Sequence, residues 1–180
     1  MSRKRLFAFV IFVGLFALAV RPAVDPDLGW HLRSGELIAT THHVPHQDPF
    51  SFTYAGAPWT AHEWLSELAI YGLWRLGGTG ALILFFAALV VLAFALLYAR
   101  CEARPYAAGL LVFWGALVTV PSWGVRPQIF TLLLASLFLW LLDRWVETGR
   151  GPWLACLPAL MALWVNLHAG FAIGVALVLL

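Results

Sequence analysis

The sequence predicts an all-α polytopic membrane protein with about five to six transmembrane helices and a helical extracytoplasmic loop after the first. Of its 180 residues, 62% are hydrophobic and 11% are charged, whereas about 25% of a soluble domain is charged. The mean hydropathy of +0.86 is too high for one water-soluble core. Several Trp residues stand where an apolar run meets a polar one, as in an aromatic belt at a membrane interface, namely Trp59, Trp64, Trp74, Trp123 and Trp153.

Apolar runs long enough to cross a bilayer occur along most of the chain. A spanning helix needs roughly 20 mostly apolar residues, and candidates lie at about residues 6–24, 79–99, 106–122, 127–143 and 153–168, with a sixth begun at residue 169. The sixth run is still apolar at Leu180, and a helix ending within the hydrocarbon would leave carbonyl groups without partners. We therefore expect residues 1–180 to be the N-terminal part of a transmembrane module, truncated at its C-terminus.

The distribution of basic residues predicts the orientation. "SRKR" places three positive charges before the first run, so the N-terminus is expected in the cytoplasm. The alternation of spans then puts residues 25–78, 123–126 and the "NLHAG" turn outside, and seven of the 11 basic residues inside. A secretory signal is the alternative interpretation of the first run, because Ala17-Leu18-Ala19 is a cleavage motif; cleavage would leave the topology unchanged.

The external segment, residues 25–78, begins with a predicted helix. In "DPDLGWHLRSGELIAT", Asp25 is suited to cap the helix and Pro26 to occupy its first position. Asp27, His31 and Ser34 would then share one face. Leu28, Leu32, Gly35 and Ala39 would form another face.

The rest of the external segment predicts a hairpin and a second helix. "FSFTYAGAPW" alternates aromatic and polar residues around a turn, which indicates a short hairpin. "TAHEWLSELAIYGLWRL" begins with a capping box of Thr60 and Glu63. We expect this helix to lie along the membrane surface before "GGTG" turns the chain into the second span. Its predicted apolar stripe consists of Leu65, Leu68, Ala69, Gly72 and Leu76.

Ionisable residues gather on the predicted outer side. All 6 histidines and six of the nine acidic residues fall there, so we expect any chemistry on the extracytoplasmic face. The net charge of +2 does not indicate nucleic acid as a partner. Two cysteines, Cys101 and Cys156, make no disulfide framework.

Several motifs resemble those of a known class of enzymes. The opening of the chain resembles that of the GT-C glycosyltransferases, which include the oligosaccharyltransferase catalytic subunit and the protein O-mannosyltransferases. "DPDLGWHLR" is similar to the D-P-aromatic-x-x-aromatic-R motif of the former, with Gly29 where an aromatic residue is usual. Over nearly the whole chain, "DPDLGWHLRSGE", "DPFSFT", "HEWLSE", "RPQIFTLLL" and "WVNLHAGF" together resemble a group of uncharacterised bacterial multipass membrane proteins usually placed near GT-C.

The resemblance implies a glycosyltransferase in the bacterial inner (cytoplasmic) membrane that acts on the extracytoplasmic face. Its partners would be the lipid bilayer and a polyprenyl-phosphate-linked sugar donor. A loop aspartate would act as general base, or would hold a divalent metal ion (Mg²⁺ or Mn²⁺), for which Asp25 is the candidate ligand.

The chemistry of that reaction selects the candidate residues. A carboxylate can take the proton of an acceptor hydroxyl, and cations or helix N-termini can stabilise a phosphate leaving group. We expect catalytic roles for Asp25, Asp27, His31 and Glu63. We expect phosphate contacts from Arg33, Arg126, Gln128, Asn166 and His168.

Each candidate also has a structural interpretation. Asp25 can be a helix cap alone, Asp27 a first-turn acid, Glu63 the capping-box partner of Thr60, His31 a solvated surface residue, and Arg126 a side chain that extends to the interface. "HHVPHQD" can bind zinc through His42, His43, His46 and Asp48, although adjacent histidines in such a turn are more often solvated.

A non-catalytic envelope protein with the same fold, either a transporter or an assembly scaffold, is the rival hypothesis. A transporter should contain charges or broken helices at mid-membrane. The predicted spans are nearly free of charge and the polar residues stand at their ends. This distribution favours chemistry at the membrane surface over transport.

Overall fold

The protein folds as a set of helices with one long projection. A computed structural model describes residues 1–101 and 104–179. Helices make up 74% of the chain, and no strand is present among the described residues. The helices are α1 (Arg3–Ala19), α2 (Leu28–Thr41), α3 (Trp64–Arg100), α4 (Pro105–Thr119), α5 (Gln128–Thr148), α6 (Pro152–Ala155), α7 (Leu157–Leu167) and α8 (Phe171–Leu179), with a 3₁₀ turn, η1 (Val120–Ser122), after α4.

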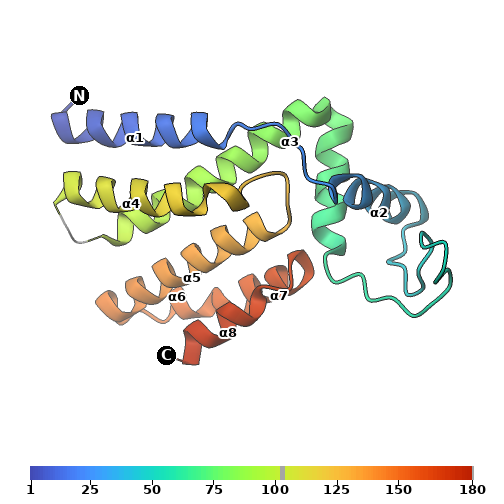
Figure 1. Cartoon of the computed structure of the whole chain (residues 1–180). Coiled ribbons are helices and arrows are strands. Elements are labelled where there is room, and N and C mark those ends of the chain that lie inside the picture. Colours follow the sequence, from blue (N-terminus) through green and yellow to red (C-terminus); the bar gives the residue numbers. More distant parts are fainter. Residues whose placement is uncertain (102–103, 180) are drawn as a thin grey trace.

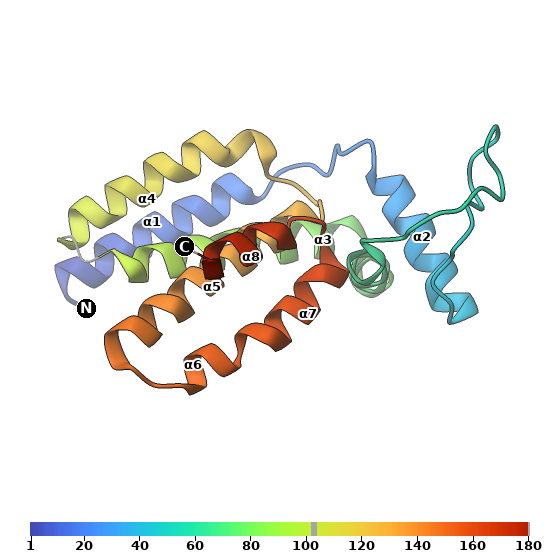
Figure 2. The same ribbon diagram turned by 90° about the horizontal axis from the view of Figure 1, so that it is seen from below.

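Six of these segments lie alongside one another as a bundle. They are α1, the second part of α3, α4, α5, α7 and α8, whereas α2 and the following loop project beyond one end (Figures 1 and 2). The N-terminus and the turn at 149–151 lie at the opposite end. Helix α3 ends and α4 begins at that same end, and Glu102 of the predicted cytoplasmic loop at 100–105 lies outside the described residues. The segments predicted to share a side of the membrane therefore share an end of the bundle.

Three helices are long and apolar enough to cross a membrane: Trp64–Arg100, Pro105–Ser122 and Gln128–Thr148. They correspond to the runs predicted at residues 79–99, 106–122 and 127–143. The run at 6–24 forms the shorter α1, and the run at 153–168 is divided between α6 and α7. The structure thus confirms an all-helical chain with three candidate spans, and the count of five to six stays a prediction.

Helix α3 is too long to be a single straight span. Its 37 residues would extend about 56 Å at 1.5 Å per residue, against a hydrocarbon core of about 30 Å. The helix bends at Gly77 (φ −158°, ψ 24°) and Gly78 (φ 61°, ψ −155°), and the first arm, residues 64–76, crosses the end of the bundle (Figure 1). Since only glycine readily adopts the conformation of Gly78, the predicted turn at "GGTG" is confirmed.

The predicted helix starts need correction. Helix α2 begins at Leu28, three residues after Asp25, although Asp25 Oδ1 still accepts a hydrogen bond from the N–H of Asp27 at 3.0 Å. The capping box of Thr60 and Glu63 does not form, because α3 begins at Trp64 and Glu63 makes no capping hydrogen bond. The carboxylate of Glu63 lies instead near two histidines.

The predicted hairpin is also reduced. Only one antiparallel bridge, Gln47 with Pro58, is found in this part of the described chain. Two backbone hydrogen bonds close the loop. Asp48 N–H donates to Ala57 O, and Gly56 N–H donates to Asp48 O, both at 2.8 Å. Aromatic contacts then attach the loop to α2, since the Trp30 ring centroid lies 4.9 Å from Phe50 and 5.4 Å from Trp59.

The first arm of α3 buries a different face from the one its apolar residues suggest. Ser66, Glu67, Ile70 and Tyr71 are buried, whereas Leu76, a member of the predicted stripe, is 85% exposed. Helix α2 packs against the arm. Of the predicted stripe, Gly72 and Leu76 are exposed and Leu65, Leu68 and Ala69 are half-buried. The C-terminal part of the stripe therefore remains available for the predicted contact with a membrane surface.

Candidate functional site

The candidate residues lie at the end of the bundle from which α2 projects. Here the linker from α1 to α2 meets the linker from α4 to α5. Arg126 makes an ion pair with Asp25 through Nε and Oδ2, and its Nη2 lies 3.9 Å from Asp27 Oδ2. A cleft of about 180 Å³ opens between the linkers and is lined in part by Asp25, Arg126 and Trp123. The structure therefore brings together three of the predicted site residues, Asp25, Asp27 and Arg126.

The two aspartates differ in their environment. The side chain of Asp25 is 4% exposed, whereas that of Asp27 is 64% exposed and that of Arg126 is 34% exposed. Asp25 also accepts the N–H of Asp27. Asp25 is thus committed to holding the two linkers together, and Asp27 is the carboxylate that a solute can reach.

The charge of this cluster limits what it can bind. Two carboxylates and one guanidinium give it a net charge of −1. A phosphate is repelled by such a cluster unless further positive charge is present. The N-terminus of α5, which follows Arg126 in the chain, adds only its partial positive charge.

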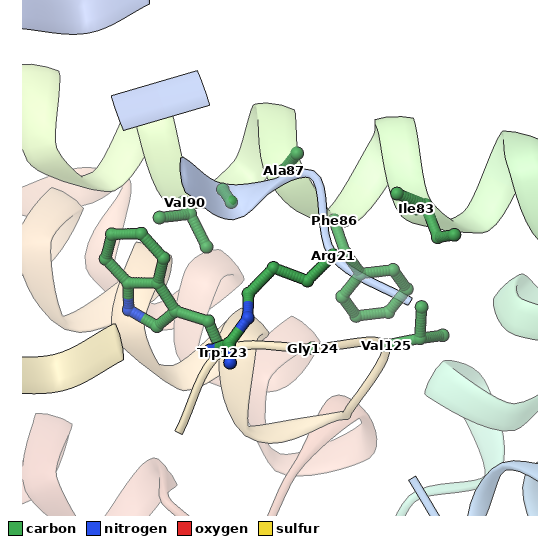
Figure 3. A pocket seen from close by; sticks show the side chains of 9 residues that line it. Arg21, Ile83, Phe86, Ala87, Val90, Trp123, Gly124 and Val125 are labelled. Atoms are coloured by element: carbon green, nitrogen blue, oxygen red, sulfur yellow. The ribbon is translucent and has the colours of Figure 1, made fainter. Parts of the chain in front are cut away.

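Arg21 fastens the same two linkers and was not among the predicted site residues. Its Nη1 donates to the carbonyl of Val120 at 2.8 Å, and its side chain lies between the rings of Trp123 and Phe86 (Figure 3). Trp123 Nε1 in turn donates to Thr119 Oγ1 at 3.1 Å. The sequence contained only a weak signal for this role, an isolated arginine directly after an apolar run.

A second group of polar residues surrounds His168, at the turn between α7 and α8. His168 Nε2 lies 3.5 Å from Glu63 Oε1, and His62 Nε2 lies 3.6 Å from the same oxygen. His168 Nδ1 is 3.0 Å from the N–H of Gly170 and 2.8 Å from Thr131 Oγ1. Because a backbone N–H can only donate, Nδ1 is the acceptor and the ring proton is on Nε2, facing Glu63.

This arrangement favours a neutral imidazole. Burial lowers the pKa of His168, His62 lowers it further, and Glu63 partly opposes both. Protonation of Nδ1 would also replace the acceptor that Gly170 N–H uses. His168 is therefore better suited to donate a hydrogen bond from Nε2 than to act as the cation that the sequence suggested for phosphate.

Asn166 is likewise engaged within the fold. Its Oδ1 accepts a hydrogen bond from Trp64 Nε1 and its Nδ2 donates to Ala162 O, both at 2.7 Å. Ser66 Oγ donates to the carbonyl of Leu167 at 2.5 Å. Together with the contact between Glu63 and His168, these bonds join the start of α3 to the α7–α8 turn.

Two further phosphate candidates are not brought to this site by any contact among the described residues. Arg33 is 68% exposed and pairs with Glu36 on its own helix. Gln128 is the half-buried first residue of α5, beside Arg126 in the chain. Arg126 is therefore a predicted phosphate ligand that carries a permanent positive charge and lies beside a candidate base, whereas His168, beside Glu63, favours the neutral form.

His31 lies in a third group, apart from Asp27. It is buried between α2 and α3, with Nδ1 3.6 Å from Glu67 Oε1. Glu67 is 3% exposed and was not singled out from the sequence. Its signal was the four-residue spacing from Glu63 on a helix with few charges, which predicts two carboxylates on one side.

Metal ligands do not cluster in the part of the chain that the structure describes, where no group of three or more His, Cys, Asp or Glu side chains could hold a metal ion. His42, His43 and His46 are exposed. The carboxylate of Asp48 is bound by the Ser51 hydroxyl and by the N–H groups of Phe50 and Ser51, which lower its pKa.

Comparisons with protein families, with curated proteins and with solved structures find no match for this chain. The resemblance to the GT-C glycosyltransferases therefore rests on the short motifs quoted above. The structure adds one fact to those motifs, which is that "DPD" and "RPQ" meet at one end of the bundle.

Proposed function

We propose that this chain belongs to a membrane glycosyltransferase that uses a polyprenyl-phosphate-linked sugar at the extracytoplasmic face of a bacterial inner membrane. The observation that supports it is the placement of an exposed carboxylate, Asp27, beside the half-exposed guanidinium of Arg126 at one end of a bundle of apolar helices. A base and a phosphate ligand are the two groups that such a transfer needs at the membrane surface.

In this proposal, Asp27 takes the proton of the acceptor hydroxyl as that oxygen bonds to the anomeric carbon. The bond from that carbon to the phosphate oxygen breaks, and Arg126 stabilises the charge of the departing polyprenyl phosphate. Asp25 orients Arg126, and His168 with Glu63 holds the neighbouring turn. Asp25 is thus a positioning residue rather than the base.

A divalent cation fits the same residues. Mg²⁺ is usually held by one or two carboxylates together with substrate phosphates and water, and Asp27 supplies one exposed carboxylate in a cluster of net charge −1. Mg²⁺ or Mn²⁺ would neutralise the phosphate charge that this cluster repels. A carboxylate bound to a cation is a weak base, so contact with a metal is the alternative to the role of base, and we propose it for Asp27 instead of the buried Asp25.

The proposed membrane placement agrees with the same geometry. In the proposed orientation the N-terminus is cytoplasmic, and α2 with the first arm of α3 lies outside. The exposed Leu76 and the indole of Trp74, 41% exposed, would then contact the lipid interface. A lipid-linked donor would reach Arg126 from that interface.

A non-catalytic envelope protein is the second candidate, and one observation favours it. The charged residues at this end are largely paired with one another, as Asp25 with Arg126, Arg33 with Glu36, and Glu63 with His168. Such pairing is what a structural scaffold requires. The two functions differ in whether the exposed Asp27 matters for turnover.

The test measures release of polyprenyl phosphate from a polyprenyl-phosphate-linked hexose by the complete protein in lipid nanodiscs. Asp27→Asn keeps the shape of the side chain and removes the base, so activity should fall by about 100-fold or more. The melting temperature of this variant should not change, because Asp27 is mostly exposed.

Asp25→Asn is the matched control on the other side of Pro26. Asn can still accept the N–H of Asp27 but cannot neutralise Arg126, so we expect a loss of stability of about 1–3 kcal/mol. Full activity of Asp27→Asn would contradict the enzymatic proposal. So would the absence of polyprenyl phosphate release by the unmodified protein with Mg²⁺ or Mn²⁺ present, and either result would favour the non-catalytic scaffold.

A further inference from the structure

The first turns of α1 and α4 lie side by side at the end of the bundle opposite the candidate site (Figures 1 and 2). The rings of Phe7 and Tyr106 are in contact, with their centroids 4.8 Å apart. A Cβ atom on Gly109 would lie 2.5 Å from Cε1 of Phe7 and 2.6 Å from Cδ1 of Ile11. The two helices therefore pack closely enough to bring together the polar residues at which they start.

Four cations stand at these two starts and form a basic patch. They are Arg3, Lys4 and Arg5 on α1, and Arg104 directly before α4. All four are exposed. None of them takes part in an ion pair within the part of the chain that the structure describes.

The acidic residues of this end do not balance the basic patch. Asp143 pairs with Arg100, and Glu147 pairs with Arg144. Glu102 is the remaining acid of the predicted cytoplasmic segments, and with it counted the basic patch still has a net charge of +3. Like charges this close together repel one another. The general excess of basic residues on the cytoplasmic side does not account for their concentration on two adjacent helices.

Apolar side chains adjoin the basic patch along both helices. Among the described elements, α1 and α4 pack on each other and on α3. Large apolar residues on their outer faces are 50–66% exposed, namely Phe9, Val10, Val13, Leu110, Leu111 and Trp114. A ligand that fits this surface is anionic at one end and apolar along the rest of its length.

We propose that the basic patch and the adjoining apolar faces of α1 and α4 bind an anionic phospholipid. Its phosphate group would lie between Arg104 and the first turn of α1, because guanidinium groups bind phosphate oxygens through paired hydrogen bonds. Its acyl chains would cover the exposed apolar side chains. Clusters of basic residues between helices on the cytoplasmic side are known to recognise such head groups.

The bound lipid has a structural consequence for the two helices. Its negative charge would reduce the repulsion between their starts and so stabilise the packing of α1 on α4. The basic patch lies at the opposite end of the bundle from Asp27 and Arg126. The lipid site is therefore independent of the proposed glycosyltransferase function.

The experiment measures quenching of Trp fluorescence by phospholipids brominated on their acyl chains, with the full chain in dodecyl maltoside micelles. Trp114 is the reporter, because it is exposed and lies about 14 Å beyond the start of α4 at 1.5 Å per residue. Its contribution is the difference between the unmodified protein and Trp114→Phe. Half-maximal quenching should need at least about fivefold less phosphatidylglycerol than phosphatidylcholine. Equal requirements for the two lipids would overturn the proposal.

Charge variants with a matched control locate the site. Arg104→Gln and Lys4→Gln should each weaken the binding of phosphatidylglycerol by about fivefold and leave that of phosphatidylcholine unchanged. Arg104→Lys keeps the charge and should bind like the unmodified protein. Arg150→Gln removes another exposed arginine at the same end, in the turn between α5 and α6, and should have no effect. An equal loss in Arg104→Gln and Arg150→Gln would show that the charge acts without a defined site, and would also overturn the proposal.

Glycerophosphate distinguishes a lipid from a free phosphate. It carries the phosphate group without acyl chains, so a large excess should not reverse the quenching, whereas unbrominated phosphatidylglycerol should. A chloride salt at the same ionic strength controls for screening. Reversal by glycerophosphate beyond that control would assign the basic patch to a soluble phosphate compound and would refute the lipid site.

Discussion

At the scale of single residues, the sequence predicted the type of side chain better than its role. Asp25, Arg126, Glu63 and His168 were all expected to matter, and all lie at one end of the bundle. Their pairing was not predicted, since Asp25 and Arg126 belong to linkers about one hundred residues apart in the chain. Local sequence patterns predict where helices start and which residues share a face, whereas an ion pair between two linkers depends on how the whole chain folds.

His168 yields a prediction about pH. Burial lowers its pKa, so the unfolded chain, with an ordinary value of about 6.5, takes up a proton before the folded chain does. Stability due to His168 is therefore complete above about pH 6.5 and is lost as the pH falls below it. Thermal unfolding in detergent at pH 8 and pH 5.5 should show this loss.

Two variants of His168 separate the titration from its hydrogen bonds. His168→Asn can still accept the N–H of Gly170 and does not titrate, so the acid sensitivity should decrease. His168→Gln places its amide toward Glu63 and loses the Gly170 bond, which should cost about 1 kcal/mol more than His168→Asn. Equal acid sensitivity in the unmodified protein and in His168→Asn would show that His168 does not cause it.

At the scale of elements, apolar runs predicted α3, α4 and α5 well, because length and hydropathy are local properties. The apolar stripe of the first arm of α3 was expected to face the membrane surface, and the face that packs on α2 was not predicted. A helix with a partner on its polar side and lipid on its apolar side has no single core-facing stripe. Hydrophobic periodicity alone cannot separate these cases, so Glu67, which faces α2, was passed over.

The close contact between α2 and α3 predicts different effects for two glycine substitutions in α2. Gly35→Ala should destabilise the protein by about 1–3 kcal/mol, because the added methyl group would overlap the backbone of Glu67. Gly29→Ala, in the same helix, meets nothing within 4 Å and should be neutral or should stabilise by up to about 1 kcal/mol. Chemical denaturation in detergent compares the two, and equal effects would mean that α2 does not pack on α3 as described.

At the scale of the whole molecule, the alternation of spans predicted which segments share an end of the bundle. The charge bias predicts the orientation in the membrane, because arginines flank the turns at the N-terminal end. The sequence did not predict that α2 and the first arm of α3 pack together at the opposite end of the bundle. That stacking arises from long-range contacts such as Gly35 with Glu67.

Accessibility to a membrane-impermeant thiol reagent tests the orientation. Cysteines are placed singly at Thr53 and Glu147 in a background without Cys101 and Cys156, and intact cells are labelled. Thr53→Cys should react and Glu147→Cys should react only after the cells are opened. The reverse pattern would place α2 in the cytoplasm and would remove the basis for an extracytoplasmic reaction.

The bend at Gly77 and Gly78 allows the two arms of α3 to change independently. The arm beyond the bend can differ in length, together with α5, to match a thicker or thinner bilayer, because its far end is joined to α5 by the ion pair between Arg100 and Asp143. The arm before the bend keeps Glu63 and Glu67 at fixed positions against the α7–α8 turn and α2. The two glycines thus allow the length of the span to vary without moving the polar residues at the end of the bundle. Related sequences with spans of different length should retain both glycines.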